Sequence, residues 1–277
     1  MIQIGYLKSI MPDPYTNPDG QEESAIQAMK TRLEERGKNN HFSRMIECYA
    51  NALPKDQPLC ALDLGCGTGV VIRQLAKRLH PESTLHGADI SQQLLEEAAR
   101  LSAGSSIAWD YLDSETLPYA DETFDVITMH TLLSHVPNPI SVLSEARRVL
   151  KKNGRLIVFD ADHAGTTYNQ GDYEMTRRCD FLLTSAIATN PDICRQLPRL
   201  LKASGYTLTN HDVDVISECG KGDYWLSSVQ GFARLLPTLG ALSEEDTEAW
   251  VSHMLQSHDE GTFFASGTFY TFYAHCE

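Results

Sequence analysis

Short apolar runs alternate with helical patterns over residues 57–161. Between the runs, apolar residues recur three or four positions apart, as in Leu94, Ala98 and Leu101, which is typical of an amphipathic helix. Strands that alternate with helices predict a parallel, doubly wound α/β sheet with helices on both faces. The five runs that we expect to be strands cover residues 59–64, 84–89, 106–111, 124–130 and 155–160.

The helix expected before the fifth strand carries the usual signals at both ends. Asn138 is placed to cap it, and Pro139 stands at its first position, where a missing N–H costs nothing. Lys151 and Lys152 suit the last turn, and the following Asn-Gly pair suits a helix stop. The sequence therefore predicts that this helix runs to residue 152.

The pattern changes on both sides of the alternating region. Residues 1–20 are rich in Pro, Asn, Asp and Gly and predict an arm, which is followed by a helix that ends at Pro54. After Asp160 we expect helices, one of them broken or kinked at Pro198, and a strand over residues 206–216. The final run, TFFASGTFYTFYAHC, is apolar or aromatic on both alternating faces, so we expect this strand to lie inside the sheet.

Three alternating glycines follow the first strand in LCALDLGCGTGVV. Ligands of such sheets bind beyond the carboxyl ends of the strands, and glycines there allow positive φ and a close approach to the backbone. Asp89 ends the second strand in HGADIS and suits a ligand with ribose hydroxyls. The dinucleotide fingerprint G-x-G-x-x-G would need glycine where Val70 stands. The loop and the acid predict a nucleoside-containing ligand and only weakly a nicotinamide one.

The composition of the chain limits which partners, metals and locations we expect. The formal net charge of −14 disfavours nucleic acid as the main partner, because an acidic surface repels a phosphate backbone. The seven cysteines form no CxxC pair and have no histidines at zinc-site spacing, so we expect no metal and a cytoplasmic location. We see no signal peptide, and no apolar run approaches the ~20 residues of a transmembrane helix, so we expect no stable membrane insertion.

Four motifs together resemble a known family. ALDLGCGTG, GADIS, LDSETLPYADETFDVI and EARRVLKKNGRLIVFD match the class I S-adenosylmethionine-dependent methyltransferases in order and spacing. The small-molecule group that includes the ubiquinone/menaquinone C-methyltransferases is the most similar. The resemblance is weaker in NPDICRQLPRLLKASGY and FFASGTFY. It implies a mostly parallel seven-stranded sheet of order 3-2-1-4-5-7-6, with an antiparallel last strand and helical lid insertions.

The resemblance also divides the chain and implies its ligands. Residues 1–56 would form an arm and helices that cover the cofactor, and residues 57–161 would form the Rossmann-like, cofactor-binding core. Residues 162–277 would supply lid helices and the last two strands of the same sheet. The cofactor would be S-adenosyl-L-methionine, and the partner a small organic methyl acceptor.

Matching positions acquire roles at the methionine end of this cofactor. Gly65 and Gly67 would pass under its amino-acid part, and Asp63 would help to order the loop. His130, at the end of the fourth strand, would line the pocket near the methionine carboxylate or the sulfonium.

The nucleoside end would meet a second group of residues. Asp89 would accept hydrogen bonds from the ribose hydroxyls, and Ile90 would pack on the adenine. Asp113 would accept a hydrogen bond from the adenine amino group, with Ser114 beside it.

Two histidines are candidates for the chemistry. Methyl transfer is a displacement at a sulfonium carbon, so the protein mainly aligns the nucleophile and excludes water. A base helps if the acceptor is a hydroxyl or an activated carbon, and histidine suits neutral pH. His135, after the fourth strand, and His163, after the fifth, lie on the ligand side. A hydrophobic pocket that only positions an already nucleophilic acceptor is equally plausible.

Aromatic residues outside the motifs are candidates for the walls of the acceptor pocket. The lid would be formed by residues 165–205 and 220–260, whereas any one of these aromatic side chains can instead pack the lid helices. The candidates are Tyr15, Tyr168, Tyr173, Trp225 and Phe232.

Other functions stay open at this level, because a fold does not determine its chemistry. A cyclase or pericyclase that retains the cofactor without methyl transfer is one alternative. A nicotinamide oxidoreductase and a binding protein with a degenerate site are more remote ones. The sequence leaves the acceptor molecule, the acceptor atom and the oligomeric state undetermined.

Overall fold

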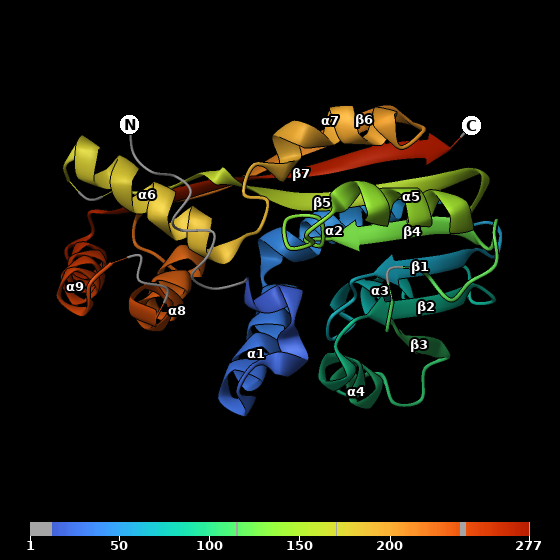
Figure 1. The fold of residues 1–277 in the computed structure, drawn as a ribbon, viewed down its shortest axis with the longest axis horizontal. Coiled ribbons are helices and arrows are strands. Elements are labelled where there is room, and N and C mark those ends of the chain that lie inside the picture. The colour runs from blue at the N-terminus through green and yellow to red at the C-terminus, as the bar shows by residue number, and fades with distance from the viewer. Residues whose placement is uncertain (1–12, 115, 170, 239–241, 277) are drawn as a thin grey trace.

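The fold is organised around one mixed sheet (Figure 1). A computed structural model describes residues 13–114, 116–169, 171–238 and 242–276 of the 277-residue chain. Seven strands lie in the order β3-β2-β1-β4-β5-β7-β6, in which β7 runs antiparallel to both of its neighbours and the first five strands are parallel. The expected fold class and strand order are confirmed. The strands are β1 Cys60–Leu64, β2 Thr84–Asp89, β3 Ile107–Tyr111, β4 Phe124–His130, β5 Leu150–Tyr168, β6 Tyr206–Gly220 and β7 Phe263–Cys276.

Helices cover both faces of the sheet because alternate strand residues point to opposite sides. In β4, Val126 joins a core with α2 and α3, whereas Ile127 and Met129 join a core with α5 and α7. Figure 1 shows α6, α8 and α9 gathered at one end of the molecule, with α1 between this group and the short strands. The helices are α1 Glu23–Lys38, α2 Asn40–Asn51, α3 Val70–Leu75, α4 Gln92–Leu101, α5 Pro139–Val149, α6 Tyr173–Ile187, α7 Ile193–Ala203, α8 Tyr224–Thr238 and α9 Glu244–Glu260.

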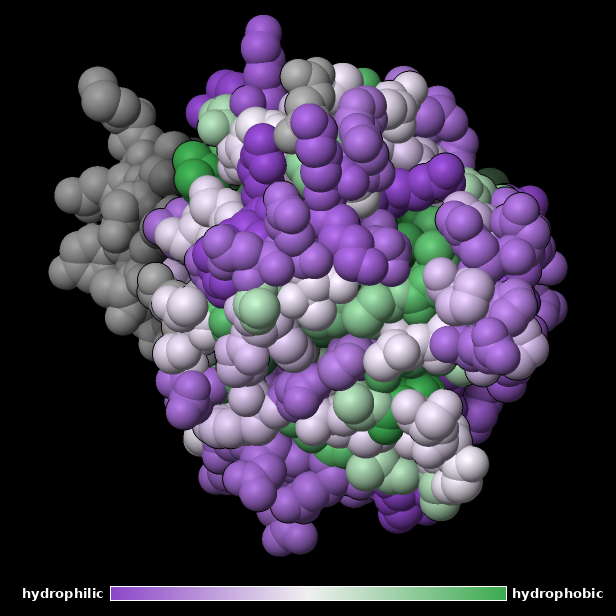
Figure 2. Space-filling model, turned by 90° about the vertical axis from the view of Figure 1, so that its right-hand side faces the viewer, coloured by the Kyte–Doolittle hydropathy of each residue, from purple (hydrophilic) through white to green (hydrophobic). Residues whose placement is uncertain are grey.

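Two short 3₁₀ turns, Pro14–Thr16 and Pro18–Gly20, lead into α1. Residues 1–12 of the arm expected from the sequence lie outside the described residues. The opposite end of the molecule, turned toward the viewer in Figure 2, is mostly hydrophilic, with apolar residues in separate small areas.

The C-terminal strand was predicted correctly. β7 lies between β5 and β6, and its aromatic side chains point into the two cores on opposite faces, Phe269 into one and Phe272 into the other. A strand that is covered on both faces has no solvent-facing side, so its sequence lacks polar alternation.

The end of α5 was predicted too far along the chain. The helix stops at Val149, and Lys151 and Lys152 already belong to β5. The pairing register of β4 with β5 shifts between Phe124 and Val126 to accommodate these residues. Lys151 then forms an ion pair of 2.9 Å with Asp125 of β4. A strand partner, rather than the helix dipole, therefore explains the basic pair.

Of the break or kink predicted at Pro198, the break does not occur. α7 continues from Ile193 to Ala203 with the proline inside it. A proline in a helix interior costs about 3 kcal/mol. Leu197, Leu200 and Leu201 are almost fully buried against the sheet, and burial of such a side chain is worth about 1.5–3 kcal/mol each. Packing therefore outweighs the local penalty.

Candidate active site

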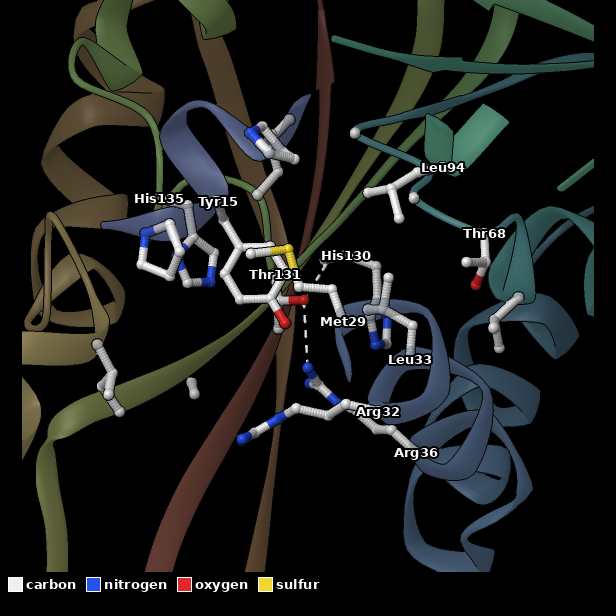
Figure 3. Close-up of a pocket in the computed structure, with 18 of the residues that line it drawn as sticks. Tyr15, Met29, Arg32, Leu33, Arg36, Thr68, Leu94, His130, Thr131 and His135 are labelled. Atoms are coloured by element: carbon white, nitrogen blue, oxygen red, sulfur yellow. Dashed lines mark hydrogen bonds between the residues drawn. The ribbon is translucent and has the colours of Figure 1, made fainter. Parts of the chain in front are cut away.

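A cavity of about 1410 Å³ opens at the carboxyl ends of the parallel strands, where the glycine loop, α1, α6 and α8 meet. Ligand pockets commonly measure roughly 300–1000 Å³. The volume is therefore large enough for two small molecules side by side. Figure 3 shows side chains of α1, of the N-terminal segment and of the strand ends directed into this space.

The glycine loop is shaped mainly by the chain's own side chains. Gly65, Gly67 and Gly69 all have positive φ, at 73°, 52° and 77°. A Cβ on Gly65 would lie 2.6 Å from Leu132 Cδ1, and one on Gly69 would collide with Trp109. Gly65 and Gly67 line the cavity, whereas Gly69 does not. The third glycine is thus required for internal packing rather than for a ligand.

Two buried carboxyl groups hold the loop. Asp63 Oδ1 accepts a hydrogen bond of 2.8 Å from Thr128 Oγ1, and burial raises the pKa of Asp63 to about 7. Asp89 Oδ2 accepts from the Gly67 amide at 2.7 Å, and its Oδ1 accepts from the Ser91 amide at 2.9 Å. Burial also raises the pKa of Asp89. Because each carboxylate oxygen has two lone pairs, Asp89 retains acceptor capacity toward the cavity.

The residues predicted for the adenine end lie together in the cavity wall. Ile90 is 45% exposed although it is a large apolar residue, and its neighbour Leu94 also lines the cavity. Asp113 and Ser114 follow β3 and line the same end, and Ser114 Oγ donates to the Thr116 carbonyl at 3.0 Å. An apolar surface next to a carboxylate suits a flat ring that carries a hydrogen-bond donor.

The N-terminal segment spans the cavity from one end to the other. Asp19 accepts a hydrogen bond of 2.8 Å from the Gln92 amide at the start of α4. Asp13 Oδ2 lies 2.7 Å from His135 Nδ1 at the far end, and the Tyr15 ring packs against the His135 ring at 4.8 Å. Two carboxylates thus tie this segment across the mouth of the cavity.

His130 is held as a neutral ring. It stacks on Phe159 with ring centroids 4.1 Å apart, and Tyr49 Oη lies 3.3 Å from its Nδ1. Burial and the nearby Arg36 guanidinium lower the pKa of His130 well below its usual value. The ring lines the cavity without carrying charge at neutral pH.

The two candidate bases lie in different environments. The His135 side chain is 15% exposed and pairs with Asp13. His163 lies with its ring 6.2 Å from that of His135, and burial lowers its pKa to about 3. The buried Nε2 of His163 has no hydrogen-bond partner among the described residues. Both rings line the cavity.

Four of the five aromatic candidates line the cavity: Tyr15, Tyr168, Trp225 and Phe232. Tyr173 is 74% exposed and lies outside the cavity wall, so that prediction was wrong. The residue stands in the first turn of α6 on the solvent side. Residue type alone does not reveal which side of a helix faces a pocket.

Two arginines on α1 were not predicted from the sequence. Arg36 donates from Nη1 to Thr131 Oγ1 at 3.3 Å, as Figure 3 shows, and its guanidinium lies 4.2 Å above the Phe42 ring. Arg32, one turn earlier, also lines the cavity. Their spacing of four residues places both on one face of the helix. That spacing was the available signal, but it is equally common on helix faces that contact only water.

Neither a metal-binding cluster nor a membrane-spanning helix occurs in the described part of the chain. Across the described residues, no group of three or more histidine, cysteine, aspartate or glutamate side chains is arranged to hold a metal ion. Within the same ranges, every helix is too short or too polar to cross a bilayer.

Comparison with known proteins identifies one domain. Residues 62–158 match the family described as a methyltransferase domain. An uncharacterized 37.1 kDa transposon protein of Streptomyces fradiae is 32% identical over 213 residues, which is 76% of this chain and 60% of that protein. The ubiquinone/menaquinone biosynthesis C-methyltransferase of Desulfotalea psychrophila is 43% identical over 99 residues, 36% of this chain and 40% of that enzyme. The chain thus spans 60% or less of these two relatives.

A solved structure supports the same assignment at the level of the fold. A methyltransferase-like protein of Bacillus halodurans superposes with a TM-score of 0.60 at 15% identity, over 83% of this chain and 97% of that one. The strand order, the four ordered motifs and the match over residues 62–158 agree. Residues 62–158 therefore form a methyltransferase domain, and the chain has the fold of the S-adenosylmethionine-dependent methyltransferases.

Proposed function

We propose that this protein transfers a methyl group from S-adenosylmethionine to a small organic acceptor. The observation that carries the proposal is the wall of the large cavity. At one end it presents the glycine loop, Asp89 and Ile90, which suit a nucleoside. At the other end it presents histidines and the aromatic side chains of α8, which suit a separate small molecule.

The donor end fits the cofactor by its chemistry. Asp89 offers acceptor capacity for a ribose hydroxyl, because the amides of Gly67, Ser91 and Ile90 use three of the four lone-pair directions of its carboxylate. Arg36 lies beside Thr131 and His130 at the end of β4, where its guanidinium suits a carboxylate. Bound there, S-adenosylmethionine would supply an electrophilic methyl group on a good leaving group.

At the acceptor end, we propose His135 as the base. The Asp13 carboxylate accepts from Nδ1–H at 2.7 Å, which leaves Nε2 of the same ring to take a proton. Because a base with a pKa of about 3 is rarely effective at neutral pH, His163 suits a hydrogen-bonding role instead. This assignment separates two histidines that the sequence left equivalent.

The acceptor is proposed only as a class. The ubiquinone/menaquinone methyltransferase aligns over 36% of this chain, and the family match at residues 62–158 ends before α6 and α8. Trp225 and Phe232 of α8 and the nearby Tyr168 are buried against one another and favour an apolar or aromatic body. A quinone-type molecule is one such body. The absence of nucleic acid and the cytoplasmic location stay predictions from charge and cysteines.

The proposal is tested by two measurements on the whole chain. Calorimetry should show binding of S-adenosylmethionine and S-adenosylhomocysteine at one site per chain. Incubation with methyl-labelled cofactor and a set of hydroxylated aromatic compounds should then give labelled product. Absence of cofactor binding would contradict the proposal. Conversion of a substrate without transfer of label would instead support a cofactor-retaining cyclase.

A further inference from the structure

Arg32 is a cation in the wall of the cavity that the donor end does not need. Its Nη1 lies 3.8 Å from the position that a Cβ on Gly231 of α8 would occupy. Its charged group lies near the hydroxyls of Tyr15, Tyr168 and Tyr224. The Arg32 residue is exposed in the absence of a ligand, and it lines the cavity. The guanidinium therefore faces the space between α1 and α8.

Arg32 has no acidic partner in the described part of the chain. None of the ion pairs found there involves Arg32 or Arg36. Two guanidinium groups one turn apart repel each other, and the Arg32 charge contributes to the lowered pKa of Arg36. Arg32 and Arg36 are thus two cations of the cavity wall that no ion pair among the described residues neutralises.

Glu35, three residues after Arg32 on α1, lines the cavity and forms no ion pair among the described residues. Three other acids in this region accept hydrogen bonds from other groups. Asp13 pairs with His135, and Asp160 accepts from the amides of Ser134 and Ala161. Asp180 accepts from the Tyr168 amide at 3.0 Å, and burial raises its pKa, which favours its neutral form. Asp223 lines the cavity but is exposed to solvent at the start of α8.

The two arginines point to different ends of the cavity. Arg36 reaches Thr131 at the end of β4, next to the glycine loop. Figure 3 shows Arg32 extending in the other direction, away from Thr68 and Leu94. Arg36 can therefore bind the carboxylate of the methyl donor, and Arg32 is then available to bind a second anion.

We propose that Arg32 binds an anionic group of the methyl acceptor, and that the acceptor is an organic acid with an apolar or aromatic body. This inference rests on the proposed function. A guanidinium donates two parallel hydrogen bonds to a carboxylate, and a partly desolvated site strengthens them. Tyr168, Trp225 and Phe232 would surround the apolar body, while the carboxylate lies between α1 and α8.

The test compares carboxylic acids with their uncharged amides. Benzoate, 1-naphthoate and decanoate, each with its primary amide, are titrated into the full chain saturated with S-adenosylhomocysteine. We expect at least one acid to bind about tenfold to a hundredfold tighter than its amide, which is the range for a hydrogen bond to a charged group. Equal affinity of every acid and its amide would overturn the proposal.

Variants test whether Arg32 is the residue that binds the acid. Arg32→Met should remove the preference for the acid and leave the affinity for S-adenosylhomocysteine within about twofold, whereas Arg32→Lys should retain part of the preference. Lys38→Met is the matched control, because Lys38 stands on the same helix outside the cavity wall. If Arg32→Met weakens the binding of S-adenosylhomocysteine as strongly as the binding of the acid, both arginines bind the methyl donor and the inference is wrong.

Two further readouts separate anion binding from a structural role of Arg32 and from a failure of the proposed function. Arg32→Met should melt at nearly the same temperature as the unliganded wild type, because it removes no ion pair of the described residues and only one exposed side chain with a hydrogen bond to Tyr224. A clear loss would indicate a structural role in holding α8. Failure of the wild type to bind S-adenosylhomocysteine would contradict the proposed function itself, before Arg32 is tested.

Discussion

Replacement of Asp89 by alanine should weaken cofactor binding by an amount that the structure lets us bound. The carboxylate accepts from the Gly67 amide at 2.7 Å and from the Ser91 amide at 2.9 Å, and it offers its remaining acceptor capacity to a ribose hydroxyl. A hydrogen bond to a charged group contributes about 1.5–3 kcal/mol, and water in the open cavity can replace part of it. We expect a loss of about 1–3 kcal/mol in binding free energy, or roughly 5- to 150-fold in Kd.

The same substitution should also lower stability, because two amides of the loop and of α4 lose their acceptor. Isothermal titration with S-adenosylhomocysteine measures the affinity, and urea denaturation of the unliganded protein measures the free energy of unfolding. Asp125→Ala is the control: its carboxylate accepts from the Cys60 amide and pairs with Lys151 at the opposite edge of the sheet. It should lower stability and leave the affinity unchanged. An Asp89→Ala protein that is folded and binds as tightly as the wild type would refute the ribose assignment.

Three further predictions follow from the loop and the histidine pair. Burial raises the pKa of Asp63 from 3.8 to about 7, so the folded state holds the proton more tightly than the unfolded state. The free energy of unfolding should therefore fall as pH rises from 4 to 7, by at most about 4 kcal/mol. Urea denaturation should show that the stability of Asp63→Asn increases relative to the wild type over that range. Gly65→Ala should lower the free energy of unfolding more than Gly104→Ala, since both have positive φ but a Cβ on Gly104 meets nothing within 4 Å; equal losses in urea would exclude the packing contribution. Asp13→Asn should lower kcat about tenfold or more with little change in cofactor affinity, because it removes the carboxylate that orients His135; an unchanged kcat in the labelled-methyl assay would exclude His135 as an oriented base.

The parts of the site that the sequence predicted are those carried by contiguous motifs. The glycine loop and Asp89 belong to one strand-loop-helix unit and its neighbour, so their relative positions follow from local geometry. The interior position of β7 was predictable for a similar reason, because a strand covered on both faces has apolar or aromatic residues on both alternating faces. In these cases one stretch of chain contains most of the information.

The contacts and residues that the sequence did not predict depend on partners far away in the chain. Asp13 and His135 are separated by 122 residues and meet only when the N-terminal segment crosses the cavity. Arg32 lies on a polar helix whose cations are typical of a hydrated surface until α8 is placed opposite it. The extension of β5 to Tyr168 likewise requires the pairing with Ala265 of β7.

The sequence by itself determined the fold class, the strand order through a family resemblance, and the place of the glycine loop and Asp89 at the ends of β1 and β2. These features are recorded in short segments with local physical requirements. The tertiary structure decided which glycine serves packing alone, which histidine has a carboxylate partner, and where unpaired positive charge faces the cavity. Burial and long-range contacts set those properties. They change the pKa of a side chain, its accessibility and its partners without any change in the neighbouring sequence.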